Sequence, residues 1–310
     1  MTKTERTIWL RERALALGFS SVGFSKAVFM DEEARRLEQW LNNGFQGQMS
    51  YLENHFDKRV DPRKLVEGAK TVISFVFNYF PEEELKETSY KIARYAYGED
   101  YHFVLKDKLG QLVSELRDLE GDFHARCFVD SAPVLERDWA KRSGLGWVGK
   151  NTLLIHPQKG SYFFLAEIIL DLDFQYDAPL KDYCGSCRKC IEACPTQAIS
   201  EKGYIMDGSK CISYLTIELK DEIPNHFKGQ YKEWIFGCDI CQEVCPWNRF
   251  SKAQQEERFR PTEAFKSLHE TEWKEISEEV FQIVLKKSAL KRTGLKGLER
   301  NIKFIEDHEK

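Results

Sequence analysis

The segment around which this protein is organised reads Cys184-Gly-Ser-Cys187-Arg-Lys-Cys190-Ile-Glu-Ala-Cys194-Pro195, then an isolated Cys211, then Cys238-Asp-Ile-Cys241-Gln-Glu-Val-Cys245-Pro246. It holds eight of the nine cysteines of the chain. The first run has the C-x2-C-x2-C-x3-C-P spacing of bacterial ferredoxins, in which three thiolates bind one 4Fe-4S cluster and the fourth binds a second cluster. Two clusters need eight thiolates, and the second run together with Cys211 completes that number.

The spacing predicts two sets of four ligands: Cys184, Cys187, Cys190 and Cys245 on one cluster, and Cys194, Cys211, Cys238 and Cys241 on the other. Zinc is the main alternative for paired C-x2-C units, but it explains neither the closely spaced third cysteine nor the two Cys-Pro endings. A disulfide framework is a weaker alternative, because the cysteines are clustered and no signal peptide is expected before them.

The composition is that of a soluble globular protein, with 42% hydrophobic and 31% charged residues. A chain of 310 residues can form one large domain and a smaller one. Its most apolar stretch, residues 162–170, is far shorter than the roughly 20 residues of a transmembrane helix. We therefore expect a cytoplasmic protein without a membrane segment, whereas the net charge of -4 does not discriminate between classes of partner.

Helices and strands are predicted to alternate up to about residue 180. The periodicity favours helices over 4–18, 34–41 and 104–119 and strands over 19–24, 71–79, 126–129 and 160–170. A further helix is expected to carry Pro133 in its first turn, to be capped by Asp130 or Ser131, and to end at Gly144. The pattern predicts an α/β domain with a mixed sheet over 1–180, a ferredoxin-like double-cluster module over 181–250, and a helical region over 251–310.

The chain resembles the epoxyqueuosine reductases, cobalamin-dependent relatives of the reductive dehalogenases. The resemblance rests on the eight spaced cysteines and on three segments: Ala-Arg-Tyr-Ala-Tyr-Gly at 93–98, Val-Asp-Ser-Ala-Pro-Val-Leu-Glu-Arg at 129–137 and Gly-Leu-Gly-Trp-Val-Gly-Lys-Asn-Thr at 144–152. It implies a nitroreductase-like domain that binds cobalamin beside two 4Fe-4S clusters. The implied activity is reduction of epoxyqueuosine to queuosine at the wobble position of tRNA anticodons, with electrons passing from the clusters to cobalamin.

Asp130 is the general acid that the resemblance suggests for this reaction. A carboxyl group buried beside an apolar corrin ring would have a raised pKa and would keep a proton for the opening epoxide. The alternative is that Asp130 only caps a helix. Asp130 and five other loop residues are the expected cobalamin contacts: Arg59, Tyr97, Lys150, Asn151 and Ser161. Cys127 is interpreted as a small buried hydrophobic residue and His102 as a polar loop residue, not a cobalt ligand.

The basic residues near the C-terminus are the expected contacts with tRNA phosphates, with a solvated helix face as the alternative. They are Lys287, Lys291, Arg292, Lys296 and Arg300, and a second candidate patch is Lys58, Arg59 and Arg63. A wobble base turned out of its stack needs a pocket, for which the aromatic candidates are Tyr95, Tyr97, Tyr101 and Trp147, unless these pack in the core. An external low-potential electron donor is implied, and a monomer is expected.

Two other functions stay open from the sequence. The first is a different oxidoreductase, either a reductive dehalogenase or a flavin-dependent nitroreductase that acts on a small molecule. The second is a ferredoxin-type electron carrier without a substrate of its own. The large part of the chain outside the cysteine segment argues against a carrier, which needs little more than its clusters.

Overall fold

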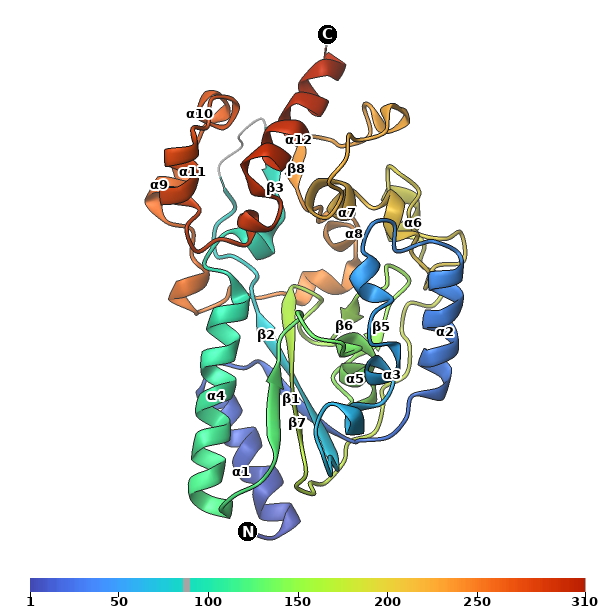
Figure 1. Cartoon of the computed structure of the whole chain (residues 1–310), viewed down its shortest axis with the longest axis vertical. Coiled ribbons are helices and arrows are strands. Elements are labelled where there is room, and N and C mark those ends of the chain that lie inside the picture. Colours follow the sequence, from blue (N-terminus) through green and yellow to red (C-terminus); the bar gives the residue numbers. More distant parts are fainter. Residues whose placement is uncertain (86–89, 310) are drawn as a thin grey trace.

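The computed structural model describes residues 1–85 and 90–309. Figure 1 shows a four-stranded sheet with its helices at the N-terminal end of the long axis and the C-terminal helices at the other end. The cysteine module lies beside both. Among the described residues, no helix is long and apolar enough to span a membrane.

The sheet has the strand order β1-β2-β7-β4. Its strands are β1 (Ser21–Lys26), β2 (Thr71–Asn78), β7 (Phe163–Leu170) and β4 (Ala125–Phe128). All three pairings are antiparallel, so the expectation of a mixed sheet is wrong for these strands. The physical reason is that the helical connection from β1 to β2 leaves and re-enters the sheet at the same end, which reverses the strand direction.

Helices cover both faces of this sheet. On one face, α1 (Lys3–Ala16) and α4 (Tyr101–Glu120) lie side by side and bury residues such as Leu10, Leu109 and Phe164. On the other face, α5 (Glu136–Arg142) buries Trp139 against Ile169 of β7. Two further helices, α2 (Asp31–Asn42) and α3 (Phe56–Arg59), lie in the connection from β1 to β2. The predicted helices and strands of this region are therefore present.

Two helix starts differ from the prediction. α4 begins at Tyr101, three residues early, because the Asp100 side chain caps it by accepting from the His102 N–H. α5 begins only at Glu136, and its N-cap residue Leu135 makes no side-chain capping bond. The expectation that Asp130 or Ser131 caps a helix with Pro133 in its first turn is therefore wrong, and Asp130 lies in a loop.

The glycine-spaced loop at 144–152 contains structure that was not predicted. It contributes β5 (Trp147–Val148), which pairs antiparallel with β6 (Leu154–Ile155). Gly146 is needed in this hairpin, because a Cβ atom there would lie 2.3 Å from the carbonyl oxygen of Ile155. The loop is thus a compact hairpin that faces the cysteine module.

The cysteine module and the C-terminal region consist of short helices, one strand and the longer helix α12. The module contains α6 (Lys189–Ala193), α7 (Ile212–Ile217), β8 (Trp234–Phe236) and α8 (Ile240–Glu243). The C-terminal region contains α9 (Glu263–Lys266), α10 (Glu270–Lys274), α11 (Glu278–Val284) and α12 (Gly294–Glu309), which confirms its predicted helical character. The 3-10 turns are η1 (Ser50–Leu52), η2 (Pro62–Lys64), η3 (Arg94–Ala96), η4 (Gly208–Lys210), η5 (Asn225–Phe227), η6 (Pro246–Phe250), η7 (Glu257–Phe259) and η8 (Ala289–Arg292).

Residues 90–97 join the two ends of the molecule. The short strand β3 (Lys91–Ile92) pairs in parallel with β8 of the cysteine module. Tyr97 packs in one core with Phe236, Trp273 and Leu298. Residues 90–97 thus pack against the cysteine module and the C-terminal region, which lie beyond the predicted domain limits near residues 180 and 250. Those limits stay a prediction.

Candidate active site and cysteine module

Asp130 lies at the tip of the loop between β4 and α5. Its backbone has a φ of 54°, a left-handed conformation that is uncommon for residues other than glycine. The Asp130 N–H donates to Oε1 of Glu136 at 2.5 Å. Its carboxylate accepts from the Tyr101 hydroxyl at 2.7 Å and lies 3.5 Å from Nε2 of His102, and the side chain is 60% exposed. Such strained positions persist where the surroundings hold them, and they gather at functional sites.

The donors around Asp130 decide its charge. Burial acts to raise the pKa of its carboxyl, but the hydrogen bonds from His102 and Tyr101 outweigh burial and lower that pKa below its ordinary value. The polypeptide alone therefore lowers the pKa of Asp130, and the raised pKa expected beside a corrin ring stays a prediction. Burial acts to lower the pKa of His102, but hydrogen bonds to Asp100 and Asp130 raise it to about 9. His102 is therefore an imidazolium that lies between the carboxylates of Asp100 and Asp130, with its Nδ1 2.6 Å from Oδ1 of Asp100.

Aromatic rings connect Asp130 with the cysteine module. Tyr101 stacks on Phe164 with ring centroids 4.2 Å apart and planes at 9°. The ring of Tyr95 lies 6.2 Å from that of Tyr101 and packs in one core with Cys211 and Cys238. Tyr95 and Tyr101 are thus beside Asp130 as candidates for the base pocket, although both are packed against the core.

The eight clustered cysteines are all partly buried and form no disulfide. In the described part of the chain, no three His, Cys, Asp or Glu side chains are placed to hold a single metal ion. A zinc site needs its donors around one ion at about 2.3 Å, whereas a 4Fe-4S cluster spreads its four thiolates over four irons.

The thiols are neighbours in two groups. Burial raises the pKa of Cys190 to about 11, and Cys184, Cys245 and Cys187 add to the rise. Burial also raises the pKa values of Cys238 and Cys241; Cys211 adds to both, and Cys194 adds to that of Cys238. We name the groups by their members. The first thiol group is Cys184, Cys187, Cys190 and Cys245, and the second thiol group is Cys194, Cys211, Cys238 and Cys241.

Three of the expected cobalamin contacts make hydrogen bonds to the cysteine module. Nζ of Lys150 donates to the carbonyl oxygens of Gly185 and Cys187 at 2.6 and 2.9 Å. Nδ2 of the buried Asn151 donates to the Cys241 carbonyl at 3.4 Å. The buried Ser161 donates its N–H to Oδ1 of Asn248 at 2.7 Å. The side chains of Lys150 and Asn151 and the backbone of Ser161 thus each fix a segment that carries or follows cluster cysteines.

The other two expected contacts are buried. The Arg59 guanidinium donates to the carbonyl oxygen of Tyr51 at 2.7 Å, and burial lowers its pKa. The Tyr97 hydroxyl donates to Glu84 at 3.4 Å, and burial raises its pKa. Arg59 thus supports the backbone under Tyr51, and Tyr97 belongs to a different network. Their contact with cobalamin stays a prediction.

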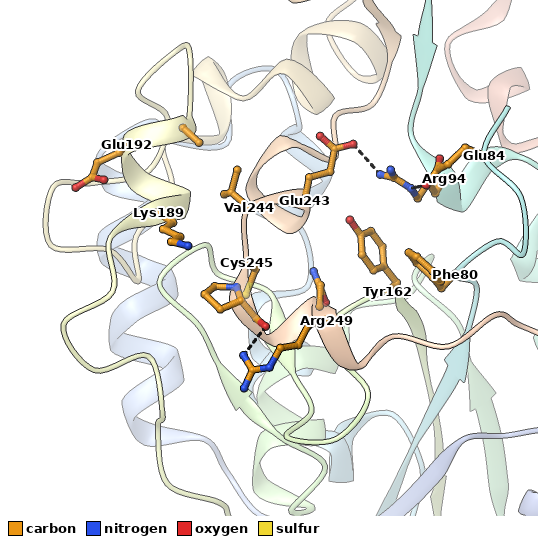
Figure 2. A pocket seen from close by; sticks show the side chains of 13 residues that line it. Phe80, Glu84, Arg94, Tyr162, Lys189, Glu192, Glu243, Val244, Cys245 and Arg249 are labelled. Carbon is orange, nitrogen blue, oxygen red and sulfur yellow. Dashed lines mark hydrogen bonds and ion pairs between the residues drawn. The ribbon is translucent and has the colours of Figure 1, made fainter. Parts of the chain in front are cut away.

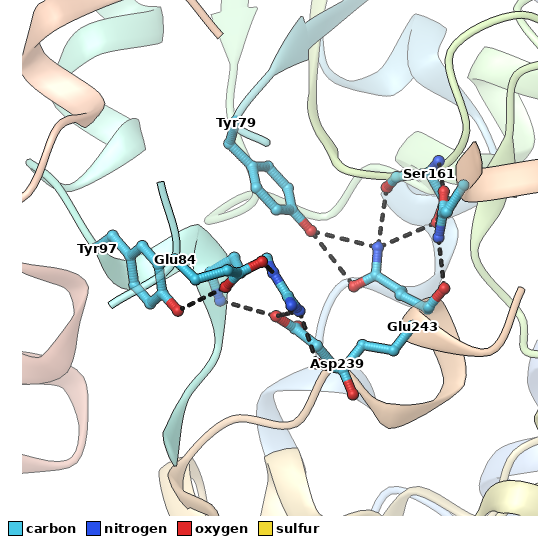
Figure 3. A network of polar contacts seen from close by, with 9 residues as sticks. Tyr79, Glu84, Tyr97, Ser161, Asp239 and Glu243 are labelled. Carbon is cyan, nitrogen blue, oxygen red and sulfur yellow. Dashed lines mark hydrogen bonds and ion pairs between the residues drawn. The ribbon is translucent and has the colours of Figure 1, made fainter. Parts of the chain in front are cut away.

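That network joins the 93–98 segment to Asp239 and Glu243 of the cysteine module (Figure 3). Arg94 donates its N–H to the buried Asp239 at 2.8 Å, and its guanidinium lies 3.2 Å from the same carboxylate. Burial raises the pKa of Asp239 to about 6, against the opposing effect of Arg94. Asp239 follows Cys238 directly, so Arg94 fixes one edge of the second thiol group.

A pocket of about 930 Å³ lies beside the first thiol group (Figure 2). Cys245 lines it together with Tyr162, Lys189 and Arg249. Arg94 pairs with Glu243 at 2.8 Å along its wall. Positively and negatively charged side chains therefore both line the pocket.

The expected tRNA contacts divide into two kinds. Lys287, Lys291 and Lys296 are exposed. Arg292 is also exposed, but it pairs with Glu218 at 3.0 Å. Arg292 lies over the ring of Tyr51, which is 43% exposed, with its guanidinium 5.7 Å from the ring centroid.

Arg300 differs from these exposed residues, because its guanidinium is bonded within the protein at the end of α7. It donates to the carbonyl oxygens of Leu215 at 3.0 Å and Leu219 at 2.6 Å, and burial lowers its pKa. In the second candidate patch, Arg63 is likewise engaged with Asp61 at 2.8 Å.

Sequence reasoning missed part of this site. His102, interpreted as an ordinary polar residue, contacts Asp130, and Glu136 accepts from the Asp130 backbone. Glu167 is fully buried. The sequence could have indicated it, because it is the single acidic residue in the apolar strand Phe163–Leu170. Trp147 is not in the base pocket, because it is buried with Nε1 3.4 Å from the Cys184 sulfur. Cys127 packs against the core as interpreted.

Known families match both parts of the chain. Residues 59–131 match the family described as epoxyqueuosine reductase QueG, DUF1730. Residues 183–248 match the 4Fe-4S double cluster binding domain. The described double cluster agrees with the two thiol groups.

Solved structures agree with this match. An epoxyqueuosine reductase crystallised with an epoxyqueuosine-modified tRNA-Tyr stem loop has a TM-score of 0.90 at 29% identity, covering 98% of this chain and 81% of the other. The enzyme from Bacillus subtilis, described with its catalytic aspartate loop swung out of the active site, has a TM-score of 0.89 at 29% identity, covering 98% and 82%.

Two curated relatives carry the same name. The epoxyqueuosine reductase of Escherichia coli is 39% identical, over 94% of this chain and 78% of its own length. That of Leadbetterella byssophila is 56% identical over 96% of this chain and 97% of its own length. At this identity over nearly the whole of both proteins, the chain belongs to the epoxyqueuosine reductase family.

Proposed function

We propose that this protein reduces epoxyqueuosine to queuosine at the wobble position of tRNA anticodons in the cytoplasm. Removal of the epoxide oxygen as water takes two electrons and two protons. The observation that carries the proposal is the joint placement of an exposed carboxylate, Asp130, with its donors Tyr101 and His102 at one end of an aromatic path to cysteine thiols. The divisions at residues 180 and 250 are retained as the proposed domain limits.

The two thiol groups are the proposed ligand sets of two 4Fe-4S clusters. Within each set the thiols act on one another's pKa, and Cys190 of the first set also acts on Cys241 of the second, which places the two sets close together. The second thiol group is the one linked to Asp130 through Tyr95, so we assign it the site nearer the reaction. The first thiol group, with its adjoining pocket, is then the side on which an external low-potential donor reduces the protein.

Cobalamin is the cofactor proposed for the surface at Asp130. The exposed Tyr51 ring and the exposed Asp130 side chain suit a broad, flat cofactor that lies against them, because both present polar and apolar edges to the same space. When bound there, cobalamin would supply the two electrons that the reduction needs. Asp130, together with Arg59, Tyr97, Lys150, Asn151 and Ser161, remains the proposed contact set, with the last three acting through the loops they hold.

Asp130 is the proposed proton donor to the epoxide oxygen. Its donors keep it charged in the polypeptide alone, so it acts as the acid only when substrate and cofactor reduce its access to water and favour the protonated form. The left-handed backbone and the single N–H contact with Glu136 allow the loop a second position. The relative described with a swung-out aspartate loop supports this reading.

The proposed tRNA surface starts at Arg292. This residue acts on the pKa of Asp130 and lies over Tyr51, so the exposed cations Lys287, Lys291 and Lys296 extend from the reaction site. Phosphate contacts from such cations supply affinity that does not depend on sequence. Arg300 is the weakest member of the proposed set, because its donors are already engaged.

The test is anaerobic incubation of the reconstituted protein with cobalamin, a strong reductant and tRNA carrying epoxyqueuosine, followed by nucleoside analysis. Queuosine should form only when cobalamin is present. Asp130→Asn should bind both clusters and tRNA as the wild type does but lose about 10²–10⁴-fold in rate, the usual contribution of a general acid. Asp118→Asn, an exposed position on α4, is the matched control. Wild-type turnover by Asp130→Asn would remove the acid role.

A further inference from the structure

Glu167 occupies a costly position in the sheet. It lies on β7, between Phe164 and Leu170 of the same apolar strand, and its side chain is fully buried. Neither carboxyl oxygen has a hydrogen-bond partner among the described residues. An ionised carboxyl group in such surroundings costs far more free energy than a neutral one, so burial alone favours the protonated acid.

Glu136 is the neighbour of Glu167 and the link to the reaction site. It is the first residue of α5, and its Oε1 accepts from the Asp130 N–H at 2.5 Å. Burial raises its pKa to about 8, and the Asp130 carboxylate adds to the rise. Burial, followed by the charge of Glu136, raises the pKa of Glu167 well above its ordinary value. Burial raises the pKa of both carboxyl groups and the charge of Glu136 adds to that of Glu167, so the two groups together hold at least one proton at neutral pH.

We propose that Glu136 and Glu167 form a carboxyl pair that positions the Asp130 loop and stores the second proton of the reaction. This inference rests on the proposed function. Release of the epoxide oxygen as water takes two protons, and Asp130 supplies one. In the proposed step, the pair transfers a proton to the Asp130 carboxylate after Asp130 has protonated the oxygen, and the pair then regains a proton from solvent water.

Few titratable groups act on this pair. Asp130 from the β4–α5 loop and His102 from α4 influence Glu136, and Asp130 and Glu136 influence Glu167. Glu136 and Glu167 therefore act on the reaction through Asp130, by positioning its loop and by supplying its proton.

The pair makes a prediction for the protein without cofactors or substrate. The folded chain should hold more protons than the unfolded chain between the ordinary pKa of 4.5 and about 8, so stability should fall as pH rises through this window. Infrared difference spectra should show a protonated carboxyl band that persists at pH 7. Glu167→Gln, which keeps the side-chain shape, should remove most of that band and flatten the fall in denaturation midpoint. Glu12→Gln, exposed on α1, should change neither.

Turnover measurements complete the test. With tRNA, cobalamin and reductant, Glu136→Gln and Glu167→Gln should each lower the rate about tenfold or more and alter its pH profile, while both clusters are retained. A wild-type chain without the infrared band at pH 7 overturns the pair, whatever its turnover. Wild-type rates and pH profiles in both Gln variants overturn its role in the reaction. Absence of queuosine formation by the wild type would instead reject the proposed function, since the infrared and stability measurements do not depend on it.

Discussion

Removal of one hydroxyl group, in Tyr101→Phe, tests how Asp130 is controlled. The Tyr101 hydroxyl donates to the Asp130 carboxylate at 2.7 Å, and its ring stacks on Phe164 at 4.2 Å. Phenylalanine keeps the stacked ring, so the substitution removes the hydrogen bond and little else.

The magnitude follows from the exposure of the carboxylate. A hydrogen bond to a charged group contributes roughly 1.5–3 kcal/mol. Asp130 is 60% exposed, so screening by water reduces the value to about 1 kcal/mol. Since 1.36 kcal/mol corresponds to a tenfold change, the protonated fraction of Asp130 should increase about fivefold.

The sign follows from which form Tyr101 favours. Its hydrogen bond favours the carboxylate and helps to lower the pKa of Asp130, so its loss raises that pKa. A rate that needs protonated Asp130 falls as pH rises through its pKa. The falling limb of the pH profile should therefore move to higher pH in Tyr101→Phe, and above the wild-type limb the rate should be about fivefold higher.

The assay is single-turnover queuosine formation across a pH series, with clusters and cobalamin fully reduced. Tyr176→Phe is the control, because its hydroxyl donates to the Lys70 carbonyl at 3.1 Å and has no contact with Asp130. If the falling limb of the pH profile stayed at the same pH in Tyr101→Phe, the 2.7 Å hydrogen bond would not control the pKa of Asp130. A large loss of rate at every pH would show that the Tyr101 hydroxyl itself takes part in the reaction. Either result refutes the reasoning.

Four further outcomes are expected. Cys211→Ser should lower the iron content of the reconstituted protein to about half, because only the second thiol group loses a ligand. Arg94→Ala should destabilise the protein by roughly 3–5 kcal/mol in denaturant unfolding, because the buried Asp239 loses its partner. Gly98→Ala should cost roughly 1–3 kcal/mol in the same assay, since the added Cβ would lie 2.4 Å from a backbone atom of Phe259. Lys291→Glu should weaken tRNA binding and reduce the slope of log affinity against log salt by about one, and an unchanged slope would count against the proposed surface.

The sequence predicted those features best that depend on residues close together in the chain. Cysteine spacing predicted the double-cluster region, which the family match over residues 183–248 confirms, because most of the cysteines lie in short loops. The division of the individual thiols between the two clusters stays a prediction. Periodicity predicted the helices of the C-terminal region for the same reason. Strand direction was wrong because it depends on where the connection from β1 to β2 re-enters the sheet, which no single residue encodes.

The candidate site was predicted only in part. Asp130 was found through the family resemblance, whereas His102 and Glu167 lie 28 and 37 residues away in sequence and meet it only in the fold. The charge of Asp130 depends on those contacts, so its pKa could not be derived from its position in the chain. Lys150 and Asn151 were expected at cobalamin because loop residues commonly contact cofactors, but their side chains donate to the cysteine loops.

The parallel pairing of β3 with β8 bears on how the protein matures during synthesis. The second thiol group lies between elements that are far apart in the chain: Tyr95 packs against it from one side, and Phe304 of α12 packs in the same core. Nδ2 of the buried Asn301 donates to the carbonyl oxygens of Thr216 and Ile235, both at 2.8 Å. These contacts cannot form before α12 has been synthesised and has left the ribosome. Iron–sulfur insertion into this group should therefore follow the emergence of α12, as a late step carried out on an almost folded protein.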